Sequence, residues 1–277
     1  MVSALGRMVE IAENGRHLSK ERGFLVVQSG KTETGRVPLD DLMAVMATAR
    51  GTTVSVALLS ALAERGVPFL VPGENFAPSA LLWPVAGHHA VSQRMAAQLD
   101  WARRLERRLW QQIVAAKIRR QGWALRQAGA PAGAFARLAA QVQPGDPENL
   151  EAQAARRYWP LMFGTAFRRD QDAPGTDALL NYGYAVIRAS VARALCAVGL
   201  HPGLGIFHRH PRNPMPLVDD LMEPFRPAVD DAVRQFLAEG IDDVTVAAKR
   251  RLVGLLWQDE ATAVGISPLG TAILRTA

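Results

Sequence analysis

The hydrophobic pattern of this chain changes its period between about residues 85 and 90. Before this point, short apolar runs alternate with turn residues such as Asn14-Gly15 and Ser29-Gly30, a pattern typical of β-strands. After it, apolar residues recur at helical spacing through long segments. The change predicts an α+β fold, with a small β-rich N-terminal domain in residues 1–85 and a larger all-α domain in residues 86–277.

The expected elements follow from where each apolar run begins and ends. In the first domain we expect strands over residues 8–12, 24–28, 36–39, 42–48 and 68–71. One helix is expected over residues 54–65, ended by Gly66, and residues 80–85 form a last strand or a connector. In the second domain, a long Ala- and Arg-rich helical stretch contains no Gly or Pro before Gly122. Further helices are expected over residues 148–158, 177–198, 218–240 (broken at Pro224 or Pro227) and 244–257.

Composition excludes several classes of protein. With 49% hydrophobic and 21% charged residues, the chain is neither disordered nor fibrous. The single cysteine, Cys196, cannot form an intrachain disulfide, which favours a reducing compartment. No signal-peptide pattern or uninterrupted apolar span is present, so we expect a soluble cytoplasmic protein. The sequence also lacks a Walker loop, a dinucleotide glycine fingerprint, a GxSxG elbow and an HExxH helix.

The positive charge of the chain is concentrated in one segment. Residues 1–80 carry 8 basic and 8 acidic side chains, whereas residues 100–126 carry 8 basic and 2 acidic ones, a difference equal to the net charge of +6. Arg103/Arg107 and Arg104/Arg108 are like charges at i,i+4, which cost an isolated helix roughly a few tenths of a kcal/mol each. Either a nearby phosphate backbone relieves this repulsion, or Glu106 and solvent do. On the first interpretation, the DNA contacts are Arg103, Arg104, Arg107, Arg108, Lys117, Arg119 and Arg120.

A second candidate site combines a loop histidine with acidic residues. If a helix begins near residue 217, Asp219 or Asp220 lies on the same face as Glu223, and their repulsion favours a bound cation or proton. His208, on the preceding loop, can supply an imidazole to the same point. Carboxylate and imidazole ligands suit Mg²⁺ or Mn²⁺ chemistry on phosphates. The alternative is that these are ordinary first-turn acidic residues, favoured by the helix dipole.

Glu151 is a third candidate. Small residues at positions 152, 154 and 155 allow another helix to approach closely, and Glu151 would then be poorly hydrated unless it is paired. Spacing alone favours the simpler interpretation, an exposed glutamate in a first helical turn.

Five motifs in order carry a resemblance to a known family. They are LWQQIVAAKIRRQ at 109–121, DPENLEAQAARRYW at 146–159, DALLNYGYAVIRA at 177–189, GLHPGLGIFH at 199–208 and DDLMEPFRP at 219–227. Together they resemble the CRISPR-associated integrases of spacer acquisition, the Cas1 family, and specifically its type II branch. The resemblance covers most of the chain, including the β-rich N-terminal part.

The resemblance implies a divalent-metal site and a division of labour between the domains. The N-terminal β-domain would serve dimerisation, and the helical domain would be catalytic. The implied ligands of Mg²⁺ or Mn²⁺ are Glu151, His208 and Glu223, and Asp220 is a neighbour that assists them. Asn181, Tyr182 and Arg226 are expected to line the active-site groove. Many members of the family have Gly where this chain has Ala152, a small change that bears on close helix packing.

The implied activity is that of a DNA integrase. A 3′-hydroxyl of a short spacer precursor would attack a phosphodiester of the CRISPR array, both being double-stranded DNA. The resemblance further implies a homodimer bound to a small dimeric Cas2 partner and, in type II systems, an effector nuclease and an end-binding ring protein. Two alternatives stay open on the sequence. One is a metal-dependent endonuclease acting on branched or repair intermediates, and the other is a catalytically silent DNA-binding scaffold.

Overall fold

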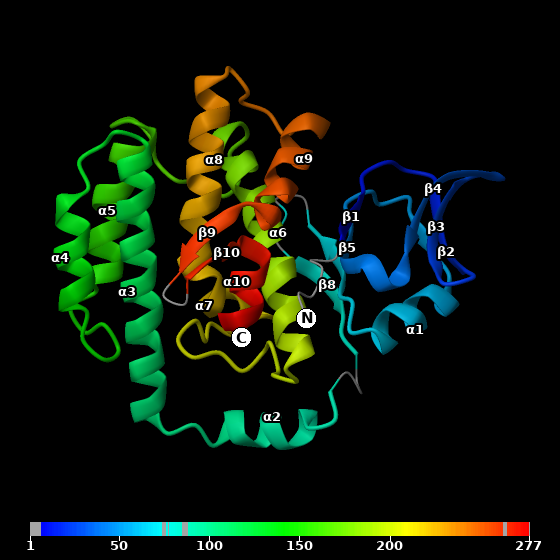
Figure 1. The fold of residues 1–277 in the computed structure, drawn as a ribbon, viewed down its shortest axis with the longest axis horizontal. Coiled ribbons are helices and arrows are strands. Elements are labelled where there is room, and N and C mark those ends of the chain that lie inside the picture. The colour runs from blue at the N-terminus through cyan, green and yellow to red at the C-terminus, as the bar shows by residue number, and fades with distance from the viewer. Residues whose placement is uncertain (1–6, 74–75, 77, 85–87, 263–264, 277) are drawn as a thin grey trace.

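The computed structural model describes residues 7–73, 76, 78–84, 88–262 and 265–276. Figure 1 shows most strands on one side of the molecule and most helices on the other, so the predicted fold class is confirmed. The strands of the first part are β1 (Arg7–Ile11), β2 (Arg16–Glu21), β3 (Phe24–Ser29), β4 (Thr32–Pro38), β5 (Leu42–Ala47), β6 (Thr53–Val54), β7 (Phe69–Pro72) and β8 (Pro78–Leu82). The helical elements among them are η1 (Leu39–Asp41) and α1 (Val56–Glu64).

These strands form two four-stranded sheets, ordered β4-β3-β2-β6 and β1-β5-β7-β8. All six residues of β5 are buried, because both faces of its sheet are covered. Leu42 and Val45 belong to a small core with α1, whereas Met43 and Met46 belong to the main core of the helical part. One sheet of the N-terminal part is therefore packed directly against the helices.

The helical part begins after residue 90. Its helices are α2 (Val91–Leu99), α3 (Arg103–Gln127), α4 (Gly133–Gln141), α5 (Leu150–Phe163), α6 (Thr176–Ala197), α7 (Pro216–Met222), α8 (Arg226–Ala238), α9 (Val246–Gly254) and α10 (Leu269–Thr276). The turns η2 (Glu223–Phe225) and η3 (Leu255–Trp257) and the hairpin β9 (Asp259–Thr262) and β10 (Gly265–Pro268) complete it. None of the helices in the described ranges is long and apolar enough to cross a membrane.

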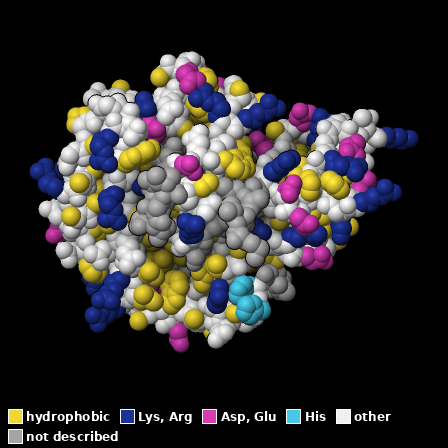
Figure 2. Space-filling view, in the orientation of Figure 1, with side chains coloured by type: hydrophobic (Ala, Val, Ile, Leu, Met, Phe, Trp, Pro, Cys, Tyr) yellow, Lys and Arg dark blue, Asp and Glu magenta, His cyan; other side chains and the backbone are white. Residues whose placement is uncertain are grey.

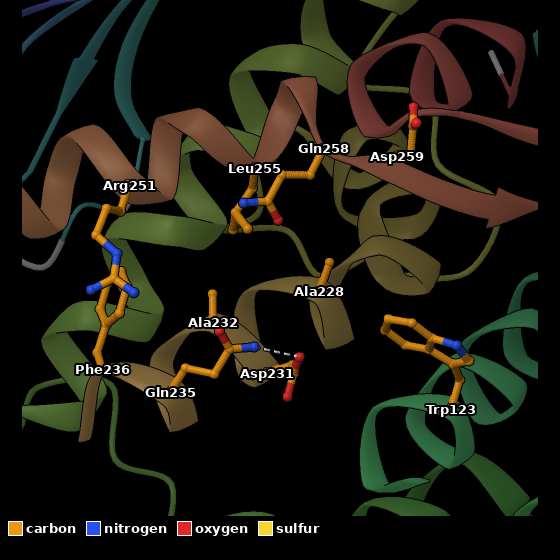
Figure 3. A pocket seen from close by; sticks show the side chains of 10 residues that line it. All are labelled: Trp123, Ala228, Asp231, Ala232, Gln235, Phe236, Arg251, Leu255, Gln258 and Asp259. Atoms are coloured by element: carbon orange, nitrogen blue, oxygen red, sulfur yellow. Dashed lines mark hydrogen bonds between the residues drawn. The ribbon is translucent and has the colours of Figure 1, made fainter. Parts of the chain in front are cut away.

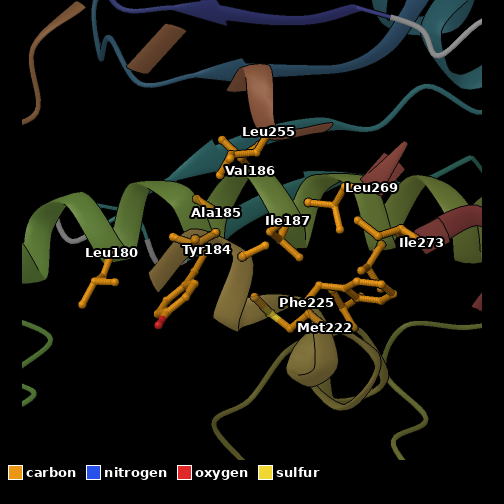
Figure 4. Packing of buried hydrophobic residues seen from close by; sticks show 14 of the residues in the cluster. Leu180, Tyr184, Ala185, Val186, Ile187, Met222, Phe225, Leu255, Leu269 and Ile273 are labelled. Carbon is orange, nitrogen blue, oxygen red and sulfur yellow. The ribbon is translucent and has the colours of Figure 1, made fainter. Parts of the chain in front are cut away.

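Helix α6 is the centre of the main core. Sixteen of its 22 residues are buried, and it is apolar nearly all round, as expected for a helix without a solvent face. Figure 4 shows Val186 of α6 beside Leu255, and Tyr184 and Ile187 facing the side of Met222 and Phe225. A Cβ at Gly183 would lie 2.3 Å from Val229 Cγ1, so the glycine permits the close crossing of α6 and α8.

Several elements differ from the sequence expectations. The long basic stretch forms two helices, α2 and α3, and α3 continues through Gly122, against which Phe135 of α4 packs. The strands β2 and β6, the helices α4 and α10, and the hairpin β9–β10 were not expected. The break predicted at Pro224 or Pro227 is present: α7 ends at Met222 and α8 begins at Arg226. Of the expected strand or connector at 80–85, position 85 lies outside the described residues.

Candidate functional site

Glu151 is held in place by the capping of α5. Asp146 accepts hydrogen bonds from the backbone N–H groups of Leu150 (2.9 Å) and Glu151 (3.0 Å), and Asn149 accepts one from Ala152 (3.2 Å). Both caps satisfy N–H groups that a helix start leaves unpaired. Asp146 is buried, so this first turn is fixed and the Glu151 side chain is directed toward α3.

Lys117, in the middle of α3, meets two glutamates. Its Nζ lies 2.6 Å from Glu151 Oε1 and 2.5 Å from Glu223 Oε2. Burial alone would lower the pKa of Lys117, but the charges of Glu223 and Glu151 outweigh burial and raise the pKa above its ordinary value. The lysine is therefore a charged ammonium that joins α3, α5 and η2.

Glu223 is buried in the short turn between α7 and α8. Its Oε1 accepts a hydrogen bond of 2.8 Å from Arg226 Nε. Burial would raise the pKa of this carboxyl, but Arg226 and Lys117 lower it to about 2. The Oε2 atom is inaccessible to solvent, and its neighbour is the Lys117 ammonium at 2.5 Å. Glu223 thus keeps a buried anionic oxygen with an unused acceptor position.

His208 is oriented by Asp220. This fully buried carboxylate accepts backbone hydrogen bonds from Ile206 (2.6 Å), Phe207 (2.9 Å) and His208 (3.0 Å), and its Oδ1 lies 2.7 Å from His208 Nδ1. With Nδ1 donating to Asp220, Nε2 keeps its lone pair for a cation. The hydrogen bond to Asp220 raises the pKa of His208; burial lowers it, and the charges of Asp220, Glu223 and Glu151 raise it further.

Aromatic rings enclose the histidine on one side. The Trp110 indole packs edge-on against the His208 ring, with centroids 5.3 Å apart. The Phe207 ring stacks on Trp110 at 4.2 Å and stays half exposed. The imidazole is therefore fixed by Asp220 at one nitrogen and by rings at its edge.

A buried junction ties α5, α6 and α8 together behind the glutamates. Tyr158 of α5 donates to Asp230 Oδ2 at 3.0 Å, and Tyr184 of α6 donates to Asp230 Oδ1. The Arg226 guanidinium lies over the Tyr184 ring, 4.7 Å from its centroid. Burial raises the pKa of Asp230 to about 6, although both tyrosine hydrogen bonds oppose the shift. The junction fixes Arg226 and, through it, Glu223.

The structure places some predicted residues differently from the sequence expectations. Lys117 was expected to contact DNA, but its ammonium faces inward to Glu151 and Glu223. Tyr182 was expected in the groove, but it is fully buried and donates to Glu10 of β1 at 2.8 Å. Successive residues of a helix are turned by about 100°, so Tyr182 and Tyr184 point to nearly opposite sides. Tyr184 therefore takes the place expected for Tyr182.

The other groove residues lie close to each other. Asn181 and Arg226 line one cavity of about 80 Å³, with Phe76, Arg169, Gln171, Tyr184 and Arg188. Of the two aspartates considered with Glu223, Asp219 pairs with Arg188 at 2.9 Å. The oxygens of Asp220 accept hydrogen bonds from the loop that carries His208, here called the histidine loop. Glu223 is thus the acidic residue of this motif with an oxygen left for a cation.

The remaining predicted DNA contacts are spread along α3. Arg103, Arg104, Arg107, Arg108 and Arg119 are exposed, and Arg120 packs over the Phe225 ring. Glu106 pairs with Arg209 of the histidine loop. Its negative charge therefore does not offset the repulsion between the arginines of α3. Arg103 and Arg104 begin the helix, where the dipole disfavours positive charge. Figure 2 shows basic side chains along the side of the molecule that α3 to α5 form, and others over the N-terminal strands.

The residues present suit a divalent metal ion in donor chemistry. Glu151 and Glu223 supply carboxylate oxygens, one of which (Glu223 Oε2) is buried against an ammonium, and His208 supplies an imidazole nitrogen. In the described part of the chain, however, no three acidic, histidine or cysteine side chains converge closely enough to form an ion cage. The ammonium of Lys117 lies between the two carboxylates, at the point where a cation is required.

A separate cavity of about 130 Å³ lies between α3, α8, α9 and β9. Figure 3 shows Trp123, Phe236 and Arg251 around it, with Asp231 hydrogen-bonded to Gln235. None of its lining residues is Glu151, His208 or Glu223. The candidate site is thus distinct from this cavity and centres on an ion cluster formed by Lys117, Glu151 and Glu223.

Sequence reasoning did not identify the residues that support the site. Asp146, Trp110, Tyr158, Tyr184 and Asp230 act through Glu151, His208 or Arg226. The segment DPEN before the predicted helix carries a capping signal for Asp146. The tyrosine and aspartate junction joins three helices far apart in the chain, and no local pattern marks it.

Comparisons with known proteins show which proteins the sequence and the fold of this chain resemble. Residues 9–260 match the protein family described as CRISPR associated protein Cas1. The chain is 38% identical over 251 residues to the CRISPR-associated endonuclease Cas1 of Neisseria meningitidis, an alignment covering 89% of this chain and 82% of that one. Its fold is similar to that of a casposase bound to integration product (TM-score 0.77, 17% identity, 97% and 88% coverage). It is also similar to a Cas6-RT-Cas1–Cas2 complex (TM-score 0.70, 19% identity, 100% of this chain and 32% of that one).

The buried junction predicts a dependence of stability on pH. The pKa of Asp230 is raised from 3.8 to about 6 on folding, so the folded protein favours the protonated form. The shifted pKa contributes on the order of 3 kcal/mol to the free energy of unfolding. This contribution is fully present below pH 3.8 and is lost as the pH rises through 6. We expect the unfolding free energy of the wild type, relative to Asp230→Asn, to fall between pH 4 and pH 6.5 in urea titrations. Parallel pH profiles for the two proteins would contradict this.

Proposed function

Because the chain belongs to the CRISPR-associated Cas1 family, we propose that it is a divalent-metal-dependent DNA integrase of CRISPR adaptation, of the type II branch. A 3′-hydroxyl of a short spacer precursor attacks a phosphodiester of the CRISPR array in a transesterification. The carrying observation is that Glu151 and Glu223 converge on one ammonium, that of Lys117, and that the charges of both carboxylates act on His208 and raise its pKa. The fold similarity to a casposase bound to integration product supports the proposal.

In this proposal Glu151, His208 and Glu223 hold Mg²⁺ or Mn²⁺. When bound, the cation polarises the phosphate and stabilises negative charge on the departing oxygen. Asp220 keeps the imidazole oriented with Nε2 available, and Arg226 keeps Glu223 ionised. Trp110 and Phe207 fix the ring position and exclude water from one side of the imidazole. Correct positioning of this kind accounts for much of the rate of phosphoryl transfer.

The exposed arginines of α3 form the proposed DNA clamp, defined as Arg103, Arg104, Arg107, Arg108 and Arg119. Their charges contact phosphates and carry no sequence information, so the choice of target comes from elsewhere. Arg104, Arg108 and Arg119 lie on the face of α3 opposite to Lys117, whereas Arg103 lies on the same side as Lys117, at the start of the helix. A single helix of 25 residues therefore carries both the proposed DNA contacts and the lysine of the ion cluster.

We also propose that the chain is a homodimer through its β-rich N-terminal part, residues 1–85, with residues 86–277 as the catalytic, DNA-binding part. A small Cas2 dimer is the proposed partner in the integration complex, and the similarity to a Cas6-RT-Cas1–Cas2 complex supports this. A type II effector nuclease belongs to the same proposal. Because Met43 and Met46 of β5 enter the core around α6, the N-terminal part also stabilises the helical part.

Loss of the ion cluster is expected to abolish catalysis without unfolding the protein. Glu151→Gln or His208→Ala should reduce strand transfer by about 100-fold or more, because each removes a group acting at the reacting phosphate. The assay follows a labelled, half-integrated DNA with Mn²⁺, with the exposed neighbour variant Glu148→Gln as the matched control. Undiminished strand transfer would refute the site. Hydrolysis in place of strand transfer by the wild type would favour the branched-DNA endonuclease.

Neutralising the clamp is expected to weaken DNA binding and its dependence on salt. Arg104→Gln with Arg108→Gln should lower the slope of log K against log[salt] by about two, one for each lost phosphate contact. Lys20→Gln with Lys31→Gln, two exposed cations of the N-terminal part, serves as the control. Fluorescence anisotropy at several salt concentrations measures both. An unchanged slope in the α3 variant would contradict the proposed DNA clamp.

The proposed dimer predicts the mass of the protein in solution. One chain has a mass of 30.1 kDa, so light scattering on the full-length protein should give about 60 kDa. A mass of about 30 kDa at micromolar concentration would contradict the dimer and leave the ion cluster unaffected.

A further inference from the structure

Lys117 is positioned as a cation in the centre of the candidate site. Its Nζ is 2.6 Å from Glu151 Oε1 and 2.5 Å from Glu223 Oε2, and these two carboxylates come from different segments. The exposed fractions of the three side chains are 13%, 20% and 6%, so little water screens the cluster. The ammonium therefore takes the place between the carboxylates that a divalent cation requires.

The charges around this point explain why a cation must be present in the metal-free protein. Two nearby buried carboxylates repel each other strongly in a medium of low dielectric constant. Arg226 neutralises Glu223 from one side through Oε1, which leaves Oε2 facing Lys117. Among the described residues, the Glu151 carboxylate pairs with Lys117 and with no other side chain. Without the ammonium, the site would hold an uncompensated buried negative charge.

We propose that Lys117 is a built-in counter-ion of the metal site: it holds Glu151 and Glu223 together in the metal-free protein and competes with the divalent cation for the same oxygens. The inference rests on the metal site of the proposed function. It assigns Lys117 a positioning role that acts through the two glutamates. The ammonium of Lys117 must then leave the space between the carboxylates when a metal ion enters.

A purely structural ion pair has a different consequence. If Lys117 only joins the helices, its removal loosens the site and weakens metal binding. If it competes with the metal, its removal leaves Glu151 unpaired and Glu223 paired with Arg226 alone, and it takes away a repelling positive charge, so metal binding becomes tighter. The direction of the change in metal affinity separates the two roles.

The test measures Mn²⁺ binding to the metal-stripped, full-length protein without DNA, from the electron paramagnetic resonance signal of free Mn²⁺. Lys117→Met should bind Mn²⁺ about tenfold or more tightly than the wild type. Lys117→Arg keeps the charge and should stay within about threefold. Lys249→Met is the matched control, because Lys249 forms a similar, partly buried ion pair at 2.7 Å with Glu10, a residue of β1. Its Mn²⁺ affinity should equal that of the wild type.

Equal or weaker Mn²⁺ binding by Lys117→Met overturns the inference while the metal site stands. Failure of the wild type to bind Mn²⁺, or binding unchanged by Glu223→Gln, instead overturns the metal site itself. If Lys117→Met is unfolded in metal-free buffer, far-UV circular dichroism should show that it folds as Mn²⁺ is added. Absence of folding at every Mn²⁺ concentration overturns the inference as well.

Discussion

The contact on which the rest of the site depends is a buried ammonium between two carboxylates. Lys117 joins α3 to α5 through Glu151 and to the turn before α8 through Glu223. An ion pair at this depth is stable only if the charges balance and the geometry is fixed. The surrounding structure supplies both, since Arg226 balances Glu223, and the Asp146 cap fixes the first turn of α5. The stability of the cluster and its chemistry therefore have the same origin.

Support for the site extends well beyond the groups at its centre. Asp220 uses both of its oxygens to shape the histidine loop, and Asp230 with its two tyrosines locks α5, α6 and α8 together. Helix α3 adds a second function, because its outward face carries exposed arginines and its inward face carries Lys117 and Trp110. A helical period of 3.6 residues allows a single element to present both faces. The proposed DNA clamp and the ion cluster are thus connected through a single helix, α3.

Local sequence pattern was sufficient for the fold class and for most long helices, because apolar periodicity records which face is buried. It was insufficient for β2, whose sequence RHLSKE is mostly polar, and for α4, which follows a Gly- and Pro-containing loop. In the site, the proline residues predicted the break around Glu223, and the family resemblance joined Glu151 to His208. The inward position of Lys117 could not be predicted, because its neighbours Arg119 and Arg120 have the same charge and only the packing of α3 on α5 distinguishes them.

The most direct test of the account is a crystal structure of the protein with Mn²⁺, read from the anomalous scattering of the metal. We expect a peak contacted by Glu151, His208 and Glu223, with the Lys117 ammonium displaced from between the two glutamates. A Mn²⁺ peak elsewhere, or none, with Lys117 still between Glu151 and Glu223 at saturating metal, would contradict it.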